Sequence, residues 1–490
     1  MKTYRPYTPD QAYLLPPSPR EWLPAGHLAY FVLELVESLD LGAIERMVQE
    51  KDPRGERPYS PRMLVAVLLY AYATGVFSSR RIERATVEDV AFRVLAAGAH
   101  PHFTTVNQFR ARHREALAAL FIQVLRACQS AGLVKLGHVA IDGTKMKANA
   151  SKHKAMSYDR MQKDDVRLRA EVETLLAQAE AVDAEEDELN GTYDPQEEIR
   201  LREERLAKMA AAREALQRET AIARAAKLRE QADELRRKSE LATTAPRNRT
   251  GFKTTAAKRD AQADLLDDDD RDPPPSADGD LPTNAPPTKP DGTPKPHAQR
   301  NFTDPESRIM VRDGAFMQAY NAQIAVDEGH QIIVAAALSN QGPDTQYFGP
   351  MLNRVVDNCN AVPSVVTADS GYFSAANIAA AEHMGAEPFI SVGKHRNDGA
   401  QTTTPPFVQH RTPAKLAMRS RLETPRGRAA YARRKATVEP VFGQIRAARG
   451  FHHVSFRGLW KNRCEWLFVC LTHNLLKLFR AQLSLTAATA

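Results

Sequence analysis

The chain has 490 residues, 43% hydrophobic and 26% charged, and its 67 Lys and Arg against 60 Asp and Glu give a formal charge of +7. It is long enough for two or three soluble domains, and four scattered cysteines without a Cys-x-x-Cys pair exclude a disulfide framework or a zinc knuckle. The basic excess favours nucleic acid as a partner, although a basic enzyme of another class would carry the same charge.

The first residues, MKTYRPYTPDQAYLLPPSP, carry prolines where a signal peptide needs an apolar run. The most apolar stretch, from Trp466 to Leu478, is too short to span a bilayer and contains His473 and Lys477. We therefore expect a cytoplasmic, nucleoid-associated protein that does not use a membrane.

Residues 1–135 show helical spacing of apolar residues and are predicted to form a helical N-terminal DNA-binding domain. Ser60-Pro61 is a typical helix start, with Ser at the N-cap and Pro at the first helical position.

Thr104 or Thr105 is expected to cap a long helix whose first turns carry Arg110 and Arg112. Helix-turn-helix proteins present basic side chains to DNA in this way, so both arginines are candidate DNA-binding residues. A solvated face on a bundle helix would look the same.

Residues 136–155 contain a short apolar run that ends at Asp142 and are predicted to begin an α/β core. Residues 156–245 are rich in Ala, Glu, Arg and Leu, and a break from Asn190 to Pro195 predicts a helical hairpin insertion. Its charges are typical of a solvated face. Residues 246–300 are rich in Pro and Asp, and we predict a disordered linker.

Residues 301–490 are predicted to complete the core. Two strands joined by a Glu328-Gly329 turn form a hairpin, and two later strands alternate with helices as in parallel crossovers. With the first strand, this gives an α/β fold with a mixed five-stranded sheet. The expected strands are 138–142, 318–327, 330–339, 364–369 and 387–393, and the expected helices are 345–360, 374–384, 429–448 and 462–482.

Two acids end strands of this sheet. Asp142 ends the first strand and Asp369 the fourth, so parallel, adjacent strands would bring both carboxylates to one edge. Glu439 lies in a helix that is able to pack over that edge. Three carboxylates there would suit Mg²⁺ or Mn²⁺ and two-metal phosphodiester chemistry, although an Asp after a buried strand is also a common turn residue.

Other acids are set aside. Asp327 ends a strand that runs antiparallel to the first, so it belongs to the opposite edge and a turn role is favoured. The remaining acids flank strands without a geometric argument or begin the helical insertion, where acids favour a helix N-terminus. These are Asp304, Asp313, Asp344, Asp159, Asp164 and Asp165.

Basic residues surround the chosen acids. Lys145 and Lys147 follow Asp142, and Tyr431, Lys435 and Arg446 share one helical face with Glu439. Such residues are able to hold phosphates and stack on a base, and we treat them as candidate DNA-binding residues. Ordinary charge pairing within the helix is the alternative.

The motifs AIDGTKMKANASK, NAQIAVD, VVTADSGYFS and KATVEPVFGQIRAARGF resemble the core of bacterial insertion-sequence transposases of the DDE type. SSRRIERATVEDVAFRVLAAG and FTTVNQFRARH are similar to the helical domain that precedes such cores. The resemblance covers nearly the whole chain outside 160–300. It implies an RNase H-like fold and a metal-binding catalytic triad of Asp142, Asp369 and Glu439.

The family's signature helix reads Tyr-x2-Arg-x3-Glu-x6-Lys. With Glu439 aligned, Arg446 takes the Lys position and Lys435 the Arg position, while Arg434 and Tyr431 are each displaced by one residue. The helical face favours Lys435 over Arg434 as the phosphate contact, and Arg434 remains a candidate DNA-binding residue.

The resemblance implies Mg²⁺- or Mn²⁺-dependent nicking at the element's terminal inverted repeats, and attack of the freed 3′-hydroxyl on target DNA by a homodimer. One alternative is a decayed transposase that binds ends without cutting. Another is a haloacid-dehalogenase phosphatase, because IDGT is similar to its motif, but Ala140 stands at the nucleophile position.

Overall fold

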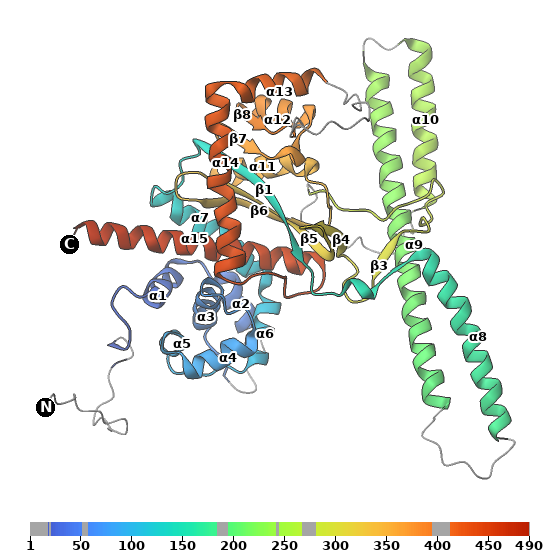
Figure 1. The fold of residues 1–490 in the computed structure, drawn as a ribbon, viewed down its shortest axis with the longest axis horizontal. Coiled ribbons are helices and arrows are strands. Elements are labelled where there is room, and N and C mark those ends of the chain that lie inside the picture. Colours follow the sequence, from blue (N-terminus) through green and yellow to red (C-terminus); the bar gives the residue numbers. More distant parts are fainter. Residues whose placement is uncertain are drawn as a thin grey trace, which may run out of the picture.

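The computed structural model describes residue 18 and residues 21–50, 57–183, 195–241, 245–266, 281–393 and 412–489. The chain is a mixed α/β protein in which helices surround a central sheet and a long helical arm projects from it (Figure 1). Among the described helices, none is both long and apolar enough to cross a membrane.

The sheet has six strands. Its central path is β6-β5-β1-β7-β8, in which β5 is antiparallel to β1 and β6 while β7 and β8 run parallel to β1. Strands occur at all five predicted places, and β4 is an additional strand that extends the β5 edge beyond β6. The strands are β1 (His138–Lys147), β4 (Arg308–Arg312), β5 (Ala315–Asp327), β6 (Ile332–Ser339), β7 (Val365–Ala368) and β8 (Glu387–Ile390).

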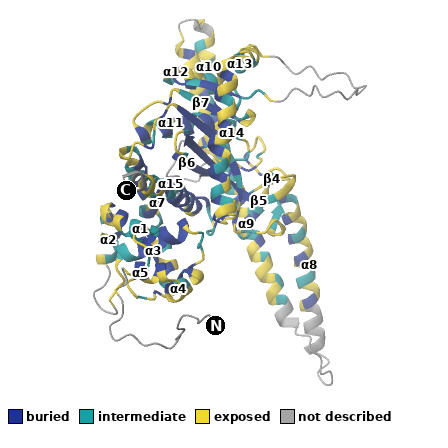
Figure 2. Ribbon diagram, turned by 60° about the vertical axis from the view of Figure 1, so that its left-hand side comes forward, coloured by how far each residue is buried: buried dark blue, intermediate teal, exposed yellow. Residues whose placement is uncertain are grey.

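The strands at the centre of the sheet are buried over most of their length, because helices pack on the sheet. Every residue of β6 is buried, and β5 is buried from Gln318 to Asp327 (Figure 2). The helices packed on the sheet include α11 (Phe348–Cys359), α14 (Pro425–Gly443) and α15 (Leu459–Thr489). α12 (Ala375–Met384) lies between β7 and β8 in the chain, and α13 (Pro413–Glu423) precedes α14.

The described residues from 28 to 130 form helices that share one hydrophobic core with the sheet. α3 begins with Pro61 at its first turn, as predicted, and is buried from Leu64 to Ala73 against α15 and its neighbours. The helices are α1 (Leu28–Ser38), α2 (Gly42–Gln49), α3 (Pro61–Ala73), α4 (Ser79–Glu88), α5 (Val90–Leu95), α6 (Phe103–Arg112) and α7 (Arg114–Ser130).

The predicted long helix after Thr104 is wrong in two respects. It is interrupted at buried His113, which separates α6 from α7, and His102 rather than a threonine caps α6 by accepting from the backbone N–H of Thr104. Arg110 and Arg112 therefore lie in the last turn of α6, not in the first turns of a helix.

The arm consists of three helices. α9 (Pro195–Glu240) is 46 residues long, or about 69 Å, and both α8 (Tyr158–Asp183) and α10 (Pro246–Asp264) pack against it (Figure 1). α8 and α9 correspond to the predicted hairpin. The break at Asn190 lies outside the described residues.

The prediction of a disordered linker over 246–300 is wrong for α10 and for the described residues 281–300. Ala263 of α10 is fully buried against Ala225 and Leu228 of α9, so small residues allow the helices to approach closely. The chain then returns to the core, where β3 (Gln299–Asn301) pairs with β2 (Ala155–Ser157). The average composition of 246–300 conceals the Ala-rich helix because Pro-rich sequence follows it.

Candidate active site

The register of the sheet places Asp142 and Asp369 side by side. β1 and β7 pair in parallel as far as Ile141 and Ala368, and the two acids are the next residue of each strand. The prediction that Asp142 ends the first strand is wrong, because β1 continues along β5 to Lys147. The acids instead lie where β7 stops and β1 continues, which leaves space beside β1 for side chains.

Asp142 is largely buried, and its pKa is shifted from the ordinary value. Arg434 Nη1 donates to its Oδ2 at 2.9 Å, and the backbone N–H of Gly143 donates to its Oδ1 at 2.8 Å. Burial nevertheless raises the pKa of Asp142 to about 6, with Arg434 opposing the rise and the nearby carboxylate of Asp369 adding to it. Two adjacent carboxylates in a partly buried site favour a bound cation.

Arg434 bridges two of the three predicted catalytic acids. Its Nη2 lies 3.8 Å from Glu439 Oε1, and its guanidinium lies 5.6 Å from the centre of the Tyr431 ring. The Arg434 side chain is 8% exposed, whereas that of Glu439 is 55% exposed. Within the described part of the chain, no three His, Cys, Asp or Glu side chains are grouped closely enough to hold a metal ion.

The structure places Arg434, and not Lys435, against Asp142, while the preference for Lys435 as the phosphate contact stays a prediction. Val438, Val441 and Ile445 form the buried stripe, and Arg434 continues that stripe one turn earlier, whereas Lys435 is exposed. Helical geometry also changes at Gln444–Ala448, which is a π-helix, so Arg446 does not continue the predicted face.

Two carboxylates of this site, those of Asp142 and Asp369, are of the kind that a divalent cation such as magnesium prefers. Asp142 and Asp369 supply carboxylate oxygens, which hard cations prefer, and Glu439 stands on the other side of Arg434. The Arg434 guanidinium already supplies positive charge at this position, so the carboxylates are arranged around a cation.

Asp344 is a polar residue of this site that the sequence analysis set aside. Its Oδ1 accepts from Lys145 Nζ at 3.0 Å, Asn321 Nδ2 at 2.7 Å and Gln323 Nε2 at 2.9 Å. The topology offers the missed signal: β6 runs parallel to β1, so the loop after β6 reaches the same edge as Asp142. Lys145, a predicted DNA contact, donates to Asp344 and to the carbonyl of Gly342 in this structure.

Tyr372 connects Asp344 with the two catalytic candidates. Its hydroxyl donates to Gln323, and burial raises its pKa well above the ordinary value, with Asp344, Asp142 and Asp369 each adding to the rise. A Cβ at Gly143 would clash with Gln323 Nε2 and would lie 3.1 Å from the Tyr372 hydroxyl. Glycine after Asp142 therefore allows this packed polar layer to form beneath the acids.

The other predicted residues fall into two groups. Arg110 is half-buried, and its Nη1 donates to the Tyr72 hydroxyl at 2.9 Å and to the Phe77 carbonyl at 2.8 Å, contacts that favour a structural role. Arg112 and Lys147 are exposed.

Asp327 has the predicted turn role at the opposite edge. Its Oδ1 accepts from the backbone N–H of Leu136 at 2.8 Å, and its Oδ2 from that of Gly329 at 3.3 Å.

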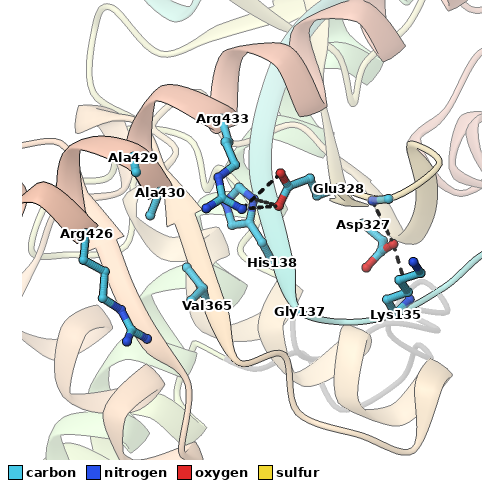
Figure 3. Close-up of a pocket in the computed structure, with 11 residues that line it drawn as sticks. Lys135, Gly137, His138, Asp327, Glu328, Val365, Arg426, Ala429, Ala430 and Arg433 are labelled. Atoms are coloured by element: carbon cyan, nitrogen blue, oxygen red, sulfur yellow. Dashed lines mark hydrogen bonds and ion pairs between the residues drawn. The ribbon is translucent and has the colours of Figure 1, made fainter.

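A second polar network lies at that opposite edge, beside a pocket of about 710 Å³ (Figure 3). Glu328 Oε2 lies 3.1 Å from His138 Nδ1 and 3.3 Å from Arg433 Nη1, and His138 Nε2 lies 2.9 Å from the Thr367 hydroxyl. Hydroxyl, imidazole and carboxylate are aligned as in a hydrolase, but Thr367 is fully buried and has no access to a substrate. The network instead joins β1, the β5–β6 turn and α14.

Two family models match the chain. Residues 293–475 match a transposase DDE domain, and residues 17–112 match a further transposase domain. The first segment contains Asp369 and Glu439, while Asp142 lies before it and joins them through the pairing of β1 with β7. Neither a curated protein nor a solved structure matches the chain significantly.

Proposed function

The chain belongs to the DDE transposases of insertion sequences, an enzyme family that cleaves DNA and transfers its strands, and we propose that it acts on the terminal inverted repeats of its element. In this proposal it hydrolyses a phosphodiester bond at each end and directs the freed 3′-hydroxyl onto target DNA. A homodimer would bring the two ends together. The substrate is double-stranded DNA.

Asp142, Asp369 and Glu439 are the proposed catalytic residues, and they would hold Mg²⁺, with Mn²⁺ as the alternative. The observation that carries this assignment is the parallel register that makes Asp142 and Asp369 neighbours. The strand order β6-β5-β1-β7-β8 supports an RNase H-like core. Divalent ions bound there supply activation of the attacking oxygen and stabilisation of the leaving oxygen.

Arg434 has two roles in this proposal. Before DNA binds, it neutralises Asp142 and faces Glu439, as the observed contacts indicate. When a phosphate enters, the same guanidinium donates to a phosphate oxygen, which is the pairing that arginine geometry favours. Tyr431, next to Arg434, is placed to contact DNA at the same point.

The proposed DNA-binding residues are the exposed or partly exposed ones among the candidates. They are Arg112, Lys147, Tyr431, Lys435 and Arg446, together with Arg434. The proposed domains are a DNA-binding helical domain over 1–135, a core over 136–155 and from 281 to the C-terminus, and the helical arm between them.

The decisive experiment is strand cleavage and joining on DNA that carries the element's own ends, with and without Mg²⁺ or Mn²⁺. Wild type is compared with Asp142→Asn, Asp369→Asn and Glu439→Gln, each first shown to be folded and to bind ends. We expect metal-dependent cutting by wild type alone. A wild-type protein that binds ends but never cuts would be a decayed transposase, and an active substitution would remove that acid from the triad.

A further inference from the structure

A groove of about 740 Å³ opens at the C-terminal end of β1, away from the residues of β1 that pair with β7. It is lined by the end of β1, the 3₁₀ turn at Lys152–Lys154, the start of β5 and the loop before α15. Four of its residues carry permanent positive charge and none of its described lining residues is acidic. The four, which define the β1-end groove together with His153 and His453, are Lys147, Lys152, Lys154 and Arg457.

The lysines of this groove are exposed and differ from Lys145 in their surroundings. Lys145 is bound by Asp344, whereas within the described chain no carboxylate lies within ion-pair distance of Lys147, Lys152 or Lys154. Positive charge that is concentrated without internal neutralisation attracts a polyanion.

The walls of the groove are held in place by one backbone hydrogen bond and two hydrogen bonds from asparagine side chains. The carbonyl of Lys147 accepts from the N–H of Val454 at 3.0 Å, and Asn149 Nδ2 donates to the Ser455 carbonyl at 2.8 Å. Asn301 Nδ2 donates to the Ser151 carbonyl at 2.8 Å, which fixes the start of the 3₁₀ turn. The charged side chains therefore project from a backbone that is already ordered, which lowers the entropic cost of binding a polyanion.

Arg312 lies along β1 between the groove and Asp142, and Arg446 lies close enough to Arg312 to interact with its charge. Arg312 Nη1 donates to the carbonyl of Lys145 at 3.1 Å. Burial lowers the pKa of Arg446, and the positive charge of Arg312 lowers it further. The carboxylate of Asp313, which pairs with Arg312 at 3.2 Å, opposes this effect on Arg446. From Asp142 to Lys147 the strand advances about 17 Å, the length of about five base-pair steps.

We propose that the β1-end groove binds the sugar-phosphate backbone of duplex DNA about five base pairs from the scissile phosphate. This inference rests on the proposed function and specifies where its substrate lies. Phe316, which is 63% exposed on the groove wall, packs against deoxyribose or an unpaired base there.

The test uses the full-length protein, labelled end DNA and binding measured against salt concentration. Lys152→Gln/Lys154→Gln is compared with Lys253→Gln/Lys258→Gln, which removes the same charge from exposed positions on α10. If both lysines contact phosphates, the groove variant should bind on the order of 10- to 60-fold more weakly at about 0.1 M salt, with a salt slope smaller by about 1.8. Equal losses in both variants, or none in the groove variant, would overturn the proposal.

Shortened DNA locates the contact. Two shortened DNAs are used, each cut back to about three base pairs on one side of the scissile phosphate. The difference in affinity between wild type and the groove variant should disappear with one of these two DNAs and persist with the other. If the difference survives both trims, the groove binds elsewhere. Phe316→Ala should weaken binding about 5-fold or more without changing the salt slope, because it removes stacking rather than charge.

These binding experiments test the groove separately from the proposed catalytic function. Cleavage by wild type with normal binding by the groove variant would overturn the groove alone. Groove-dependent binding without any cleavage by wild type would overturn the enzymatic proposal and leave the groove intact.

Discussion

Two consecutive arginines of α14 meet carboxylates at opposite edges of the same sheet. Arg434 pairs with Asp142 at 2.9 Å, where the two side chains are 8% and 17% exposed. Arg433 pairs with Glu328 at 3.3 Å, where they are 56% and 33% exposed. The chemical groups are the same, and the surroundings differ.

This difference in burial changes what each pair does. A solvent-exposed ion pair is screened and contributes little, whereas a buried one retains strong electrostatic interactions and a high cost of desolvation. The pKa of Asp142 therefore stays above its ordinary value although an arginine is bound to it. We interpret the buried pair as part of the reaction centre and the exposed pair as a clamp that holds α14 on the sheet.

The largest expected effect comes from removing the acid of each pair. Asp142→Asn should lower strand cleavage by on the order of 10³-fold or more, because it removes a proposed metal ligand whose contribution is several kcal/mol. Glu328→Gln keeps an oxygen for His138 and should change cleavage by less than about 3-fold. Single-turnover cleavage of end DNA measures both. Similar losses in the two folded variants would mean that the second network also takes part in the reaction.

The next effect concerns stability, because burial makes the charge of Asp142 costly. The folded chain holds the Asp142 proton more tightly than the unfolded chain, so this group's contribution to stability is present below pH 3.8 and lost as the pH rises through about 6. At pH 7.5 Asp142→Asn should therefore raise the free energy of unfolding by about 1–3 kcal/mol, and by much less at pH 4.

Urea unfolding at the two pH values measures this difference. Asp327→Asn provides a comparison at a second buried acid: burial also raises the pKa of Asp327, but three backbone N–H groups donate to its carboxylate and oppose the rise. A destabilised Asp142→Asn at both pH values would contradict the interpretation of Asp142 as a strained functional group.

A third comparison removes the arginines. Arg434→Gln should lower cleavage by about 10- to 100-fold, since a charge-assisted hydrogen bond to phosphate contributes about 1.5–3 kcal/mol. Arg433→Gln should lower it less than about 3-fold. End binding is measured beside cleavage, so that a folded variant with normal binding and slow cleavage assigns Arg434 to the reaction. Equal rates in the two variants would place Arg434 outside it.

Part of this contrast could be predicted from sequence. Apolar runs and turn residues identified the central strands, because a strand leaves a local pattern in the sequence. The parallel direction of the first and fourth strands then predicted that Asp142 and Asp369 lie side by side. Asp344 could also have been found, since β6 runs parallel to β1 and its loop reaches the same edge.

The face of α14 that meets the sheet could not be predicted by counting residues along the helix. Counting residues from Glu439 selected Lys435, whereas burial of Val438, Val441 and Ile445 decides which face of α14 meets the sheet and places Arg434 there. The roles of Arg110 and Lys145 depend on long-range partners, Tyr72 and Asp344, that no local pattern shows. The same limit applies to α10, whose burial depends on contact with α9.

The smallest effect is expected from the exposed pair itself. In a double-mutant cycle of Glu328→Gln and Arg433→Gln, the coupling should be below about 1 kcal/mol and should vanish at about 1 M salt, because water screens a pair with these exposures. The cycle of Asp142→Asn and Arg434→Gln should keep its coupling at the same salt, because little solvent reaches that pair. Unfolding free energies at low and high salt measure both couplings. If the Glu328–Arg433 coupling survived high salt, the two edges would hold their arginines by the same means, and burial would not explain why only one of them carries the reactive carboxylates.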